Sequence, residues 1–70
     1  MKSLAELVIE LRRKDRLSQE DFAKKLGYSS KSTINKIEKG VNDISYEKLV
    51  KLIEEYKLTY KDFLSDDDQD

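Results

Sequence analysis

The chain has 70 residues, a formal net charge of −1 at neutral pH, and no histidine, cysteine or proline. A chain this short forms one domain that buries only about 60% of its unfolded surface, which leaves little room for a deep active site. The absence of histidine and cysteine excludes the common catalytic triads, thiol nucleophiles, disulfide bonds and imidazole–thiolate metal sites.

Apolar residues recur at helical rather than strand spacing in four segments of the chain. The first segment predicts a helix over about 3–14, on Leu4, Leu7, Val8 and Leu11. The second and third helices are short, and they bury Phe22, Ala23 and Leu26, then Ile34 and Ile37. The fourth predicts a helix over about 46–57, on Leu49, Leu52, Ile53 and Tyr56. A fifth short helix is expected to carry Phe63 and Leu64, so the predicted fold class is all-α with five helices.

Capping residues mark where several of these helices begin and end. Ser18 followed by Asp21 resembles a capping box, in which two side chains each bond the other residue's backbone N–H. At the start of the fourth helix, Ile44-Ser45 with Leu49 has the pattern of a hydrophobic staple, and each such start signal contributes about 1 kcal/mol. The second and third helices are expected to end at Gly27 and Gly40, because glycine favours the left-handed conformation that ends many helices.

We expect one domain over residues 1–65, followed by an acidic disordered tail at 66–70. The tail lacks the glycine and the final glutamate of a calcium-binding loop, so we interpret it as a solubilising terminus rather than a metal site. The predicted hydrophobic core consists of Leu4, Leu7, Val8, Leu11, Phe22, Ala23, Leu26, Ile34, Ile37, Ile44, Leu49, Leu52 and Ile53.

Charge is unevenly distributed along the chain. Residues 12–39 hold nine Lys or Arg against four Asp or Glu, a surplus of five, whereas residues 40–70 hold four against nine, a deficit of five. A basic segment within a nearly neutral chain is typical of nucleic-acid binding. Two solvated faces of ordinary surface charge would give the same distribution, so charge alone does not decide between these interpretations.

Residues 18–40 have the pattern of two short helices joined by a tight, glycine-containing turn, the geometry that presents a second helix to the DNA major groove. Ala23 is small where the two helices must approach closely. One side of the third helix is apolar, and the other side carries side chains that can donate hydrogen bonds to base edges or phosphates: Lys31, Ser32, Asn35, Lys36 and Lys39. Ser30 is its predicted N-cap, which places Lys31 and Ser32 at the end that enters the groove.

This combination resembles the lambda-repressor-like (Cro and xenobiotic-response-element type) helix-turn-helix family over about residues 3–65. The elements that carry the resemblance are Arg12, Ser18-Gln19, Ala23, Gly27 and Ile34-Asn35-Lys36-Ile37-Glu38-Lys39-Gly40. One residue more separates Gly27 from Ile34 than in the commonest pattern, and we place the extra residue, Ser29, in the turn. The resemblance implies a five-helix DNA-binding domain that regulates transcription as a repressor of phage or bacterial type.

Nine residues form the predicted DNA interface: Gln19, Ser30, Lys31, Ser32, Thr33, Asn35, Lys36, Lys39 and Asn42. Gln19, in the first turn of the second helix, is expected to contact a phosphate, as the family's glutamine does. The candidates for base-edge contacts are Lys31, Ser32 and Lys36, because lysine suits guanine acceptors and serine suits either partner. Lys39 and Asn42 are expected to face the DNA backbone. The alternative for each of the nine is an ordinary solvated side chain.

The resemblance also implies an internal ion pair between Arg12 and Glu38, which would hold the third helix against the first rather than touch DNA. The C-terminal part of the domain is rich in apolar residues, namely Tyr56, Tyr60, Phe63 and Leu64. Core packing is the first interpretation of these four residues, and a dimer interface is the second.

The function predicted from these features is sequence-specific binding of double-stranded DNA, without a cofactor and without enzymatic activity. A homodimer on a two-fold operator, with half-sites about 34 Å apart, would compensate for the few base contacts of one domain.

The apolar stretch at 4–11 contains two glutamates and is too short to cross a bilayer, so a cytoplasmic protein is expected. The alternative function is an antitoxin-like or accessory module on the same fold, whose main partner is a protein.

Overall fold

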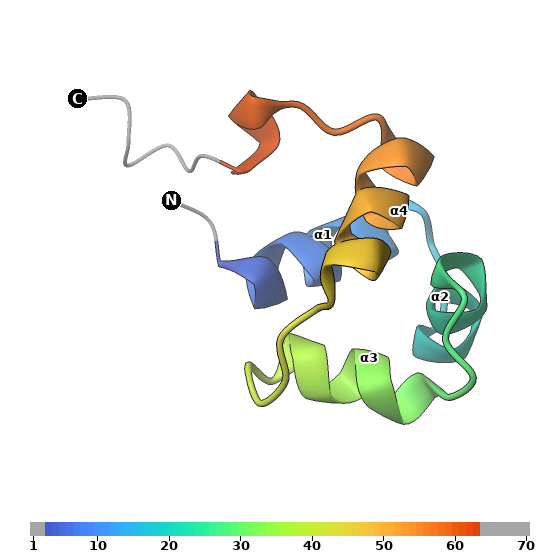
Figure 1. Cartoon of the computed structure of the whole chain (residues 1–70). Helices are drawn as coiled ribbons and strands as arrows, with labels where there is room; N and C mark the ends of the chain where they lie inside the picture. The colour runs from blue at the N-terminus through green and yellow to red at the C-terminus, as the bar shows by residue number, and fades with distance from the viewer. Residues whose placement is uncertain (1–2, 64–70) are drawn as a thin grey trace.

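The computed structural model describes residues 3–63, which form four α-helices, one short 3-10 helix and no strand (Figure 1). The elements are α1 (Leu4–Lys14), α2 (Gln19–Leu26), α3 (Lys31–Glu38), α4 (Tyr46–Tyr56) and η1 (Tyr60–Phe63). The predicted all-α class is confirmed, and the four predicted α-helices begin and end within one or two residues of the observed bounds.

The prediction of a fifth α-helix is wrong, because the segment at Tyr60–Phe63 is a 3-10 helix of four residues. Asp62 N–H donates to the Thr59 carbonyl three residues back, the bonding pattern of a 3-10 turn. The Asp62 carboxylate in turn accepts from the Thr59 backbone N–H at 2.6 Å, which fixes the start of this turn. Leu64 and the predicted tail at 66–70 lie outside the described residues.

Serine caps the N-terminus of each of the four α-helices of the described chain. Ser18, Ser30 and Ser45 occupy the predicted positions, and each side chain accepts a hydrogen bond from a backbone N–H in the first turn. At α1 the capping box is complete, because Ser3 bonds the Glu6 N–H and Glu6 bonds the Ser3 N–H. At α2 only the serine half of the predicted box forms among the described hydrogen bonds, consistent with an aspartate side chain that is one methylene shorter than glutamate.

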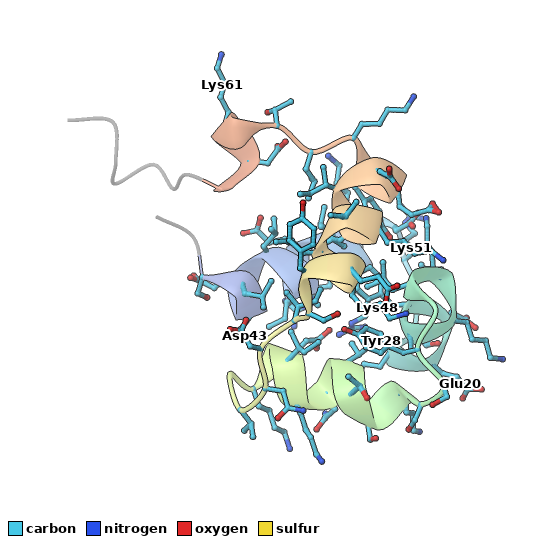
Figure 2. All side chains as sticks on the ribbon, in the orientation of Figure 1. Glu20, Tyr28, Asp43, Lys48, Lys51 and Lys61 are labelled. Atoms are coloured by element: carbon cyan, nitrogen blue, oxygen red, sulfur yellow. The ribbon has the colours of Figure 1, made fainter. Side chains whose placement is uncertain are left out.

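The turn between α2 and α3 depends on a left-handed residue at Gly27, whose φ is 87°. Its N–H bonds carbonyls in the last turn of α2, and its carbonyl accepts from Lys48 Nζ of α4 at 3.2 Å. The same ammonium group lies 5.2 Å from the centre of the Tyr28 ring, and Figure 2 shows the two side chains next to each other. The turn is therefore fixed by its own backbone and by a cation from the fourth helix.

The hydrophobic core is built where α1, α2 and α3 meet, with α4 packed on α2 (Figure 1). Eight of the predicted core residues are at most 3% exposed: Leu7, Val8, Phe22, Ala23, Leu26, Ile34, Ile37 and Leu52. The other five predicted core residues are only half-buried, namely Leu4, Leu11, Ile44, Leu49 and Ile53. A domain this small has too little interior to cover every apolar side chain of its helices completely.

A polar cluster joins α4 to the corner between α1 and α2. Lys25 Nζ lies 2.7 Å from Asp15 Oδ2, and the Tyr56 hydroxyl donates to the same oxygen at 2.8 Å. The Lys25 ammonium also lies 4.6 Å from the centre of the Tyr56 ring, whose other neighbour is the Phe22 ring at 6.0 Å. Burial and the hydrogen bond to Asp15 raise the pKa of Tyr56 to about 12.

The Asp15 cluster predicts an acid-sensitive contribution to stability. Hydrogen bonds from Lys25 and Tyr56 hold the pKa of Asp15 below its ordinary value of 3.8. The contribution is therefore complete above that value and is lost as the pH falls through the lower folded-state pKa. In thermal melts followed by circular dichroism, Asp15→Asn should lower Tm at neutral pH, and this difference should shrink as the pH falls below 3.8. Glu55→Gln removes the same charge from an exposed site of α4 and serves as the control. A difference in Tm that is independent of pH would contradict this assignment.

Candidate nucleic-acid interface

Helix α3 forms one outer edge of the molecule, and α1, α2 and α4 all lie on the same side of it (Figure 1). Its inner face is anchored by Ile34 and Ile37, which are 0% and 1% exposed. The residues on its outer side are exposed, namely Lys31, Ser32, Lys36 and Lys39. Thr33 and Asn35 lie at the two borders of this outer side and are half-buried.

The N-terminus of α3 begins where the sequence predicted. The Ser30 hydroxyl accepts from the Ser32 N–H at 3.1 Å and lies 2.9 Å from the Ser32 hydroxyl. Ser29 therefore belongs to the turn, and Lys31 is the first helical residue, as the predicted register requires. Lys31 and Ser32 are both exposed at this end of the helix.

An ion pair fixes the C-terminal end of α3 to α1. Arg12 Nε lies 2.6 Å from Glu38 Oε2, and Arg12 Nη2 donates to Glu38 Oε1 at 3.3 Å, so the contact is bidentate. A third guanidinium nitrogen, Nη1, donates to the Leu17 carbonyl at 3.1 Å. The two side chains are 19% and 9% exposed, which reduces the screening of their attraction by water.

Two of the predicted DNA contacts belong to the same network as this ion pair. Gln19 Nε2 donates to Glu38 Oε1 at 3.1 Å, and Asn35 Nδ2 donates to Gln19 Oε1 at 3.5 Å. Sequence reasoning treated Gln19 and Asn35 as independent polar side chains. Nothing in the sequence pairs them, because 16 positions separate them and only the packing of α2 on α3 brings them together.

The lysines of the basic segment divide into two groups. Lys24 lies 3.5 Å from Glu20, and Lys25 bonds Asp15, so part of the positive charge of α2 is used within the domain. By contrast, no ion pair within residues 3–63 involves the three lysines of the outer side of α3, Lys31, Lys36 and Lys39. The same is true of three exposed basic residues at the end of α1 and in the turn after it, Arg13, Lys14 and Arg16. The unpaired positive charge of the basic segment therefore lies at two places, and one of them is the outer side of α3.

The loop that follows α3 carries Asn42, which is exposed and whose backbone N–H bonds the Lys36 carbonyl at 3.2 Å. This loop and the start of α4 also expose two large side chains that the sequence did not single out, Val41 at 70% and Tyr46 at 82%. Of the four candidate dimer residues, Tyr56 packs within the domain, and the side chains of Tyr60, Phe63 and Leu64 lie outside the described part of the structure.

Comparison with known proteins agrees with this geometry. The sequence model of one family, described as helix-turn-helix, matches residues 8–63 and so covers most of the chain. No curated protein and no solved structure matches the chain. Within residues 3–63, none of the helices has the length and apolar character that a membrane span requires.

The Arg12–Glu38 pair predicts a large stability loss when one partner is removed. Glu38→Ala leaves the half-buried guanidinium uncompensated and should lower the free energy of unfolding by about 3 kcal/mol, measured by urea denaturation. The double variant Arg12→Met with Glu38→Leu should recover part of this loss, because neither charge remains unpaired. Glu54→Ala, at an exposed position of α4, is the control and should change stability by less than about 0.5 kcal/mol. Unchanged stability in Glu38→Ala would refute the role given to this pair.

Proposed function

This chain belongs to the lambda-repressor-like helix-turn-helix family and has the DNA-binding domain of a transcription regulator, and on that premise we propose that it is a sequence-specific repressor of phage or bacterial type. The observation that carries the proposal is the outer side of α3, where polar side chains and unpaired lysines are exposed on a helix that the core fixes from behind. A helix presented in this way fits the major groove of B-DNA.

Each polar residue of the interface has a role in this proposal. Lys31, Ser32 and Lys36 contact base edges, because they are exposed along the outer side of α3. The residues proposed to position the helix on the DNA backbone are Gln19, Ser30, Thr33, Lys39 and Asn42. Asn35 is also proposed to contact DNA, and its role is not assigned to either group here. Arg12 and Glu38 stabilise the helix without touching DNA.

The distribution of charge supports the same orientation of the domain. Residues 51–63, which include the C-terminal half of α4 and η1, carry three carboxylates and three lysines, so this region has no net charge. In Figure 1, η1 lies at the opposite end of the molecule from α3. DNA bound at α3 therefore approaches the lysines of that helix, whereas the opposite end of the described chain has no net positive charge that would attract its phosphates.

We further propose that the protein acts as a cytoplasmic homodimer on a two-fold operator and needs no cofactor. One α3 helix offers few base contacts, and two copies on adjacent half-sites double them.

The second candidate function is an antitoxin-like or accessory module whose main partner is a protein. The observation that favours it is the exposure of Val41 and Tyr46, at 70% and 82%, because a protein partner would cover two large side chains that the domain itself leaves in water.

Charge reversal on α3 separates the two candidates. Lys31→Glu with Lys36→Glu should abolish the gel shift of a duplex selected from a random pool, because two attractive contacts become repulsive. Lys61→Glu makes the same change for one residue of η1 and should leave the shift nearly unchanged; Figure 2 shows Lys61 at the far end of the molecule. Normal DNA binding by the doubly reversed protein would show that α3 is not the reading helix. Failure of the wild type to select any duplex would favour the protein-binding module.

Salt should weaken binding in proportion to the number of phosphate contacts. Each contact releases condensed counterions, so log affinity should fall linearly with log salt concentration, by about 0.9 per phosphate contacted. Lys39→Ala should reduce this slope by about 1 and weaken binding to all sequences equally. Lys36→Ala should also relax base preference at one position, with a loss of about 1–3 kcal/mol for the preferred duplex. An affinity that does not depend on salt would contradict the proposed backbone contacts.

A further inference from the structure

The hydrogen bonds that link Glu38, Gln19 and Asn35 can form with only one assignment of donors and acceptors. The Glu38 carboxylate accepts and cannot donate, and Arg12 donates and cannot accept. The amide of Gln19 must therefore turn its nitrogen toward Glu38, at 3.1 Å, and its oxygen away. That oxygen accepts from the amide nitrogen of Asn35, at 3.5 Å. Reversing the Gln19 amide would set its carbonyl oxygen against a carboxylate oxygen. Glu38 therefore determines the orientation of the Gln19 amide, and Gln19 in turn determines the orientation of the Asn35 amide.

The orientation of Asn35 leaves a defined pair of groups for an external partner. One hydrogen of Nδ2 is directed to Gln19, while the second hydrogen and the carbonyl oxygen Oδ1 have no partner among residues 3–63. Asn35 also lies in the same row of α3 as Lys31 and Lys39, one turn from each, at the border of the exposed outer side. One N–H of Nδ2 and the oxygen Oδ1 of the same amide are thus available together where DNA is proposed to bind.

Adenine is the base whose major-groove edge matches this pair, because its N7 accepts and its N6 amino group donates. Guanine presents two acceptors, N7 and O6, and an asparagine amide with one free donor cannot satisfy both. We propose that Asn35 is a specificity-determining residue that reads an adenine, and that Gln19 and Glu38 are the positioning residues that fix the polarity of its amide. The inference rests on the proposed function and names the base that one residue of the interface recognises.

The positioning part of the proposal has a physical consequence. A solvated asparagine can exchange its oxygen and nitrogen by rotating its amide, and binding must then select one orientation. Here the orientation is set before DNA arrives, so less conformational freedom is lost on binding. Gln19 therefore affects base preference at the position read by Asn35, which a residue that contacts only phosphate would not do.

The test is selection from a randomised duplex pool, followed by affinity measurements on single-position variants of the selected site. Asn35→Ala should lose the preference for adenine at one position of each half-site, by roughly tenfold, and keep the preferences elsewhere. Gln19→Met keeps a side chain of similar length without its hydrogen bonds, and it should reduce the preference at that same position. Glu38→Gln is the second positioning variant. Its amide group can donate to Gln19 as well as accept from it, so the amide of Gln19 is no longer held in one orientation. Lys36→Ala is the matched control, and its loss should fall at a different position. Thermal melts of every variant check that the fold is kept.

Three outcomes would overturn the inference. If the wild type selects a site and Asn35→Ala leaves every base preference unchanged, Asn35 reads no base, and the proposed function still stands. If Asn35→Ala loses the adenine preference but Gln19→Met and Glu38→Gln weaken all duplexes uniformly, the positioning role is refuted. If the wild type selects no duplex at all, this inference and the proposed function fail together.

Discussion

The geometry of the proposed interface depends on one ion pair, between Arg12 at the end of α1 and Glu38 at the end of α3. Both side chains are largely removed from water, so each charge needs the other to offset its desolvation. The carboxylate receives donors from Arg12 and from Gln19, which places residues of three helices around one acidic group. The orientation of the helix proposed to face DNA is thus determined by a contact that lies outside the proposed base-reading surface.

The apolar core alone would hold α3 less specifically. Ile34 and Ile37 bury one side of an eight-residue helix, and a helix that short is not stable without tertiary contacts. Apolar contacts have no directional preference, so they permit small rotations of the helix that a bidentate ion pair opposes. A second polar cluster, formed by Asp15, Lys25 and Tyr56, has the same effect on α4. The domain therefore combines a small core with directional polar contacts at its edges.

The distribution of charge along the chain gives only part of the electrostatic picture. Residues 12–39 hold a surplus of five positive charges, but Arg12, Lys24 and Lys25 are paired with carboxylates inside the domain. No ion pair within residues 3–63 involves the other six basic residues of this segment. Three of them belong to α3 or its C-cap, namely Lys31, Lys36 and Lys39, and three lie at the end of α1 and in the turn after it, namely Arg13, Lys14 and Arg16. A nearly neutral protein can in this way present a basic surface to DNA.

The sequence by itself determined the four α-helices, three of their four serine caps, the glycine turn and the eight fully buried residues, because these follow from apolar spacing and from signals within one helical turn. Its resemblance to a known family implied the Arg12–Glu38 pair, which the structure contains. The tertiary structure alone decided the contact of Gln19 with Asn35, the Asp15–Tyr56 hydrogen bond and the 3-10 form of the fifth segment. The first two join residues 16 and 41 positions apart, and such contacts form only when packing brings distant helices together. The predicted core residues that are only half-buried have the same explanation, since periodicity shows which face of a helix is apolar but not how much of that face another helix covers.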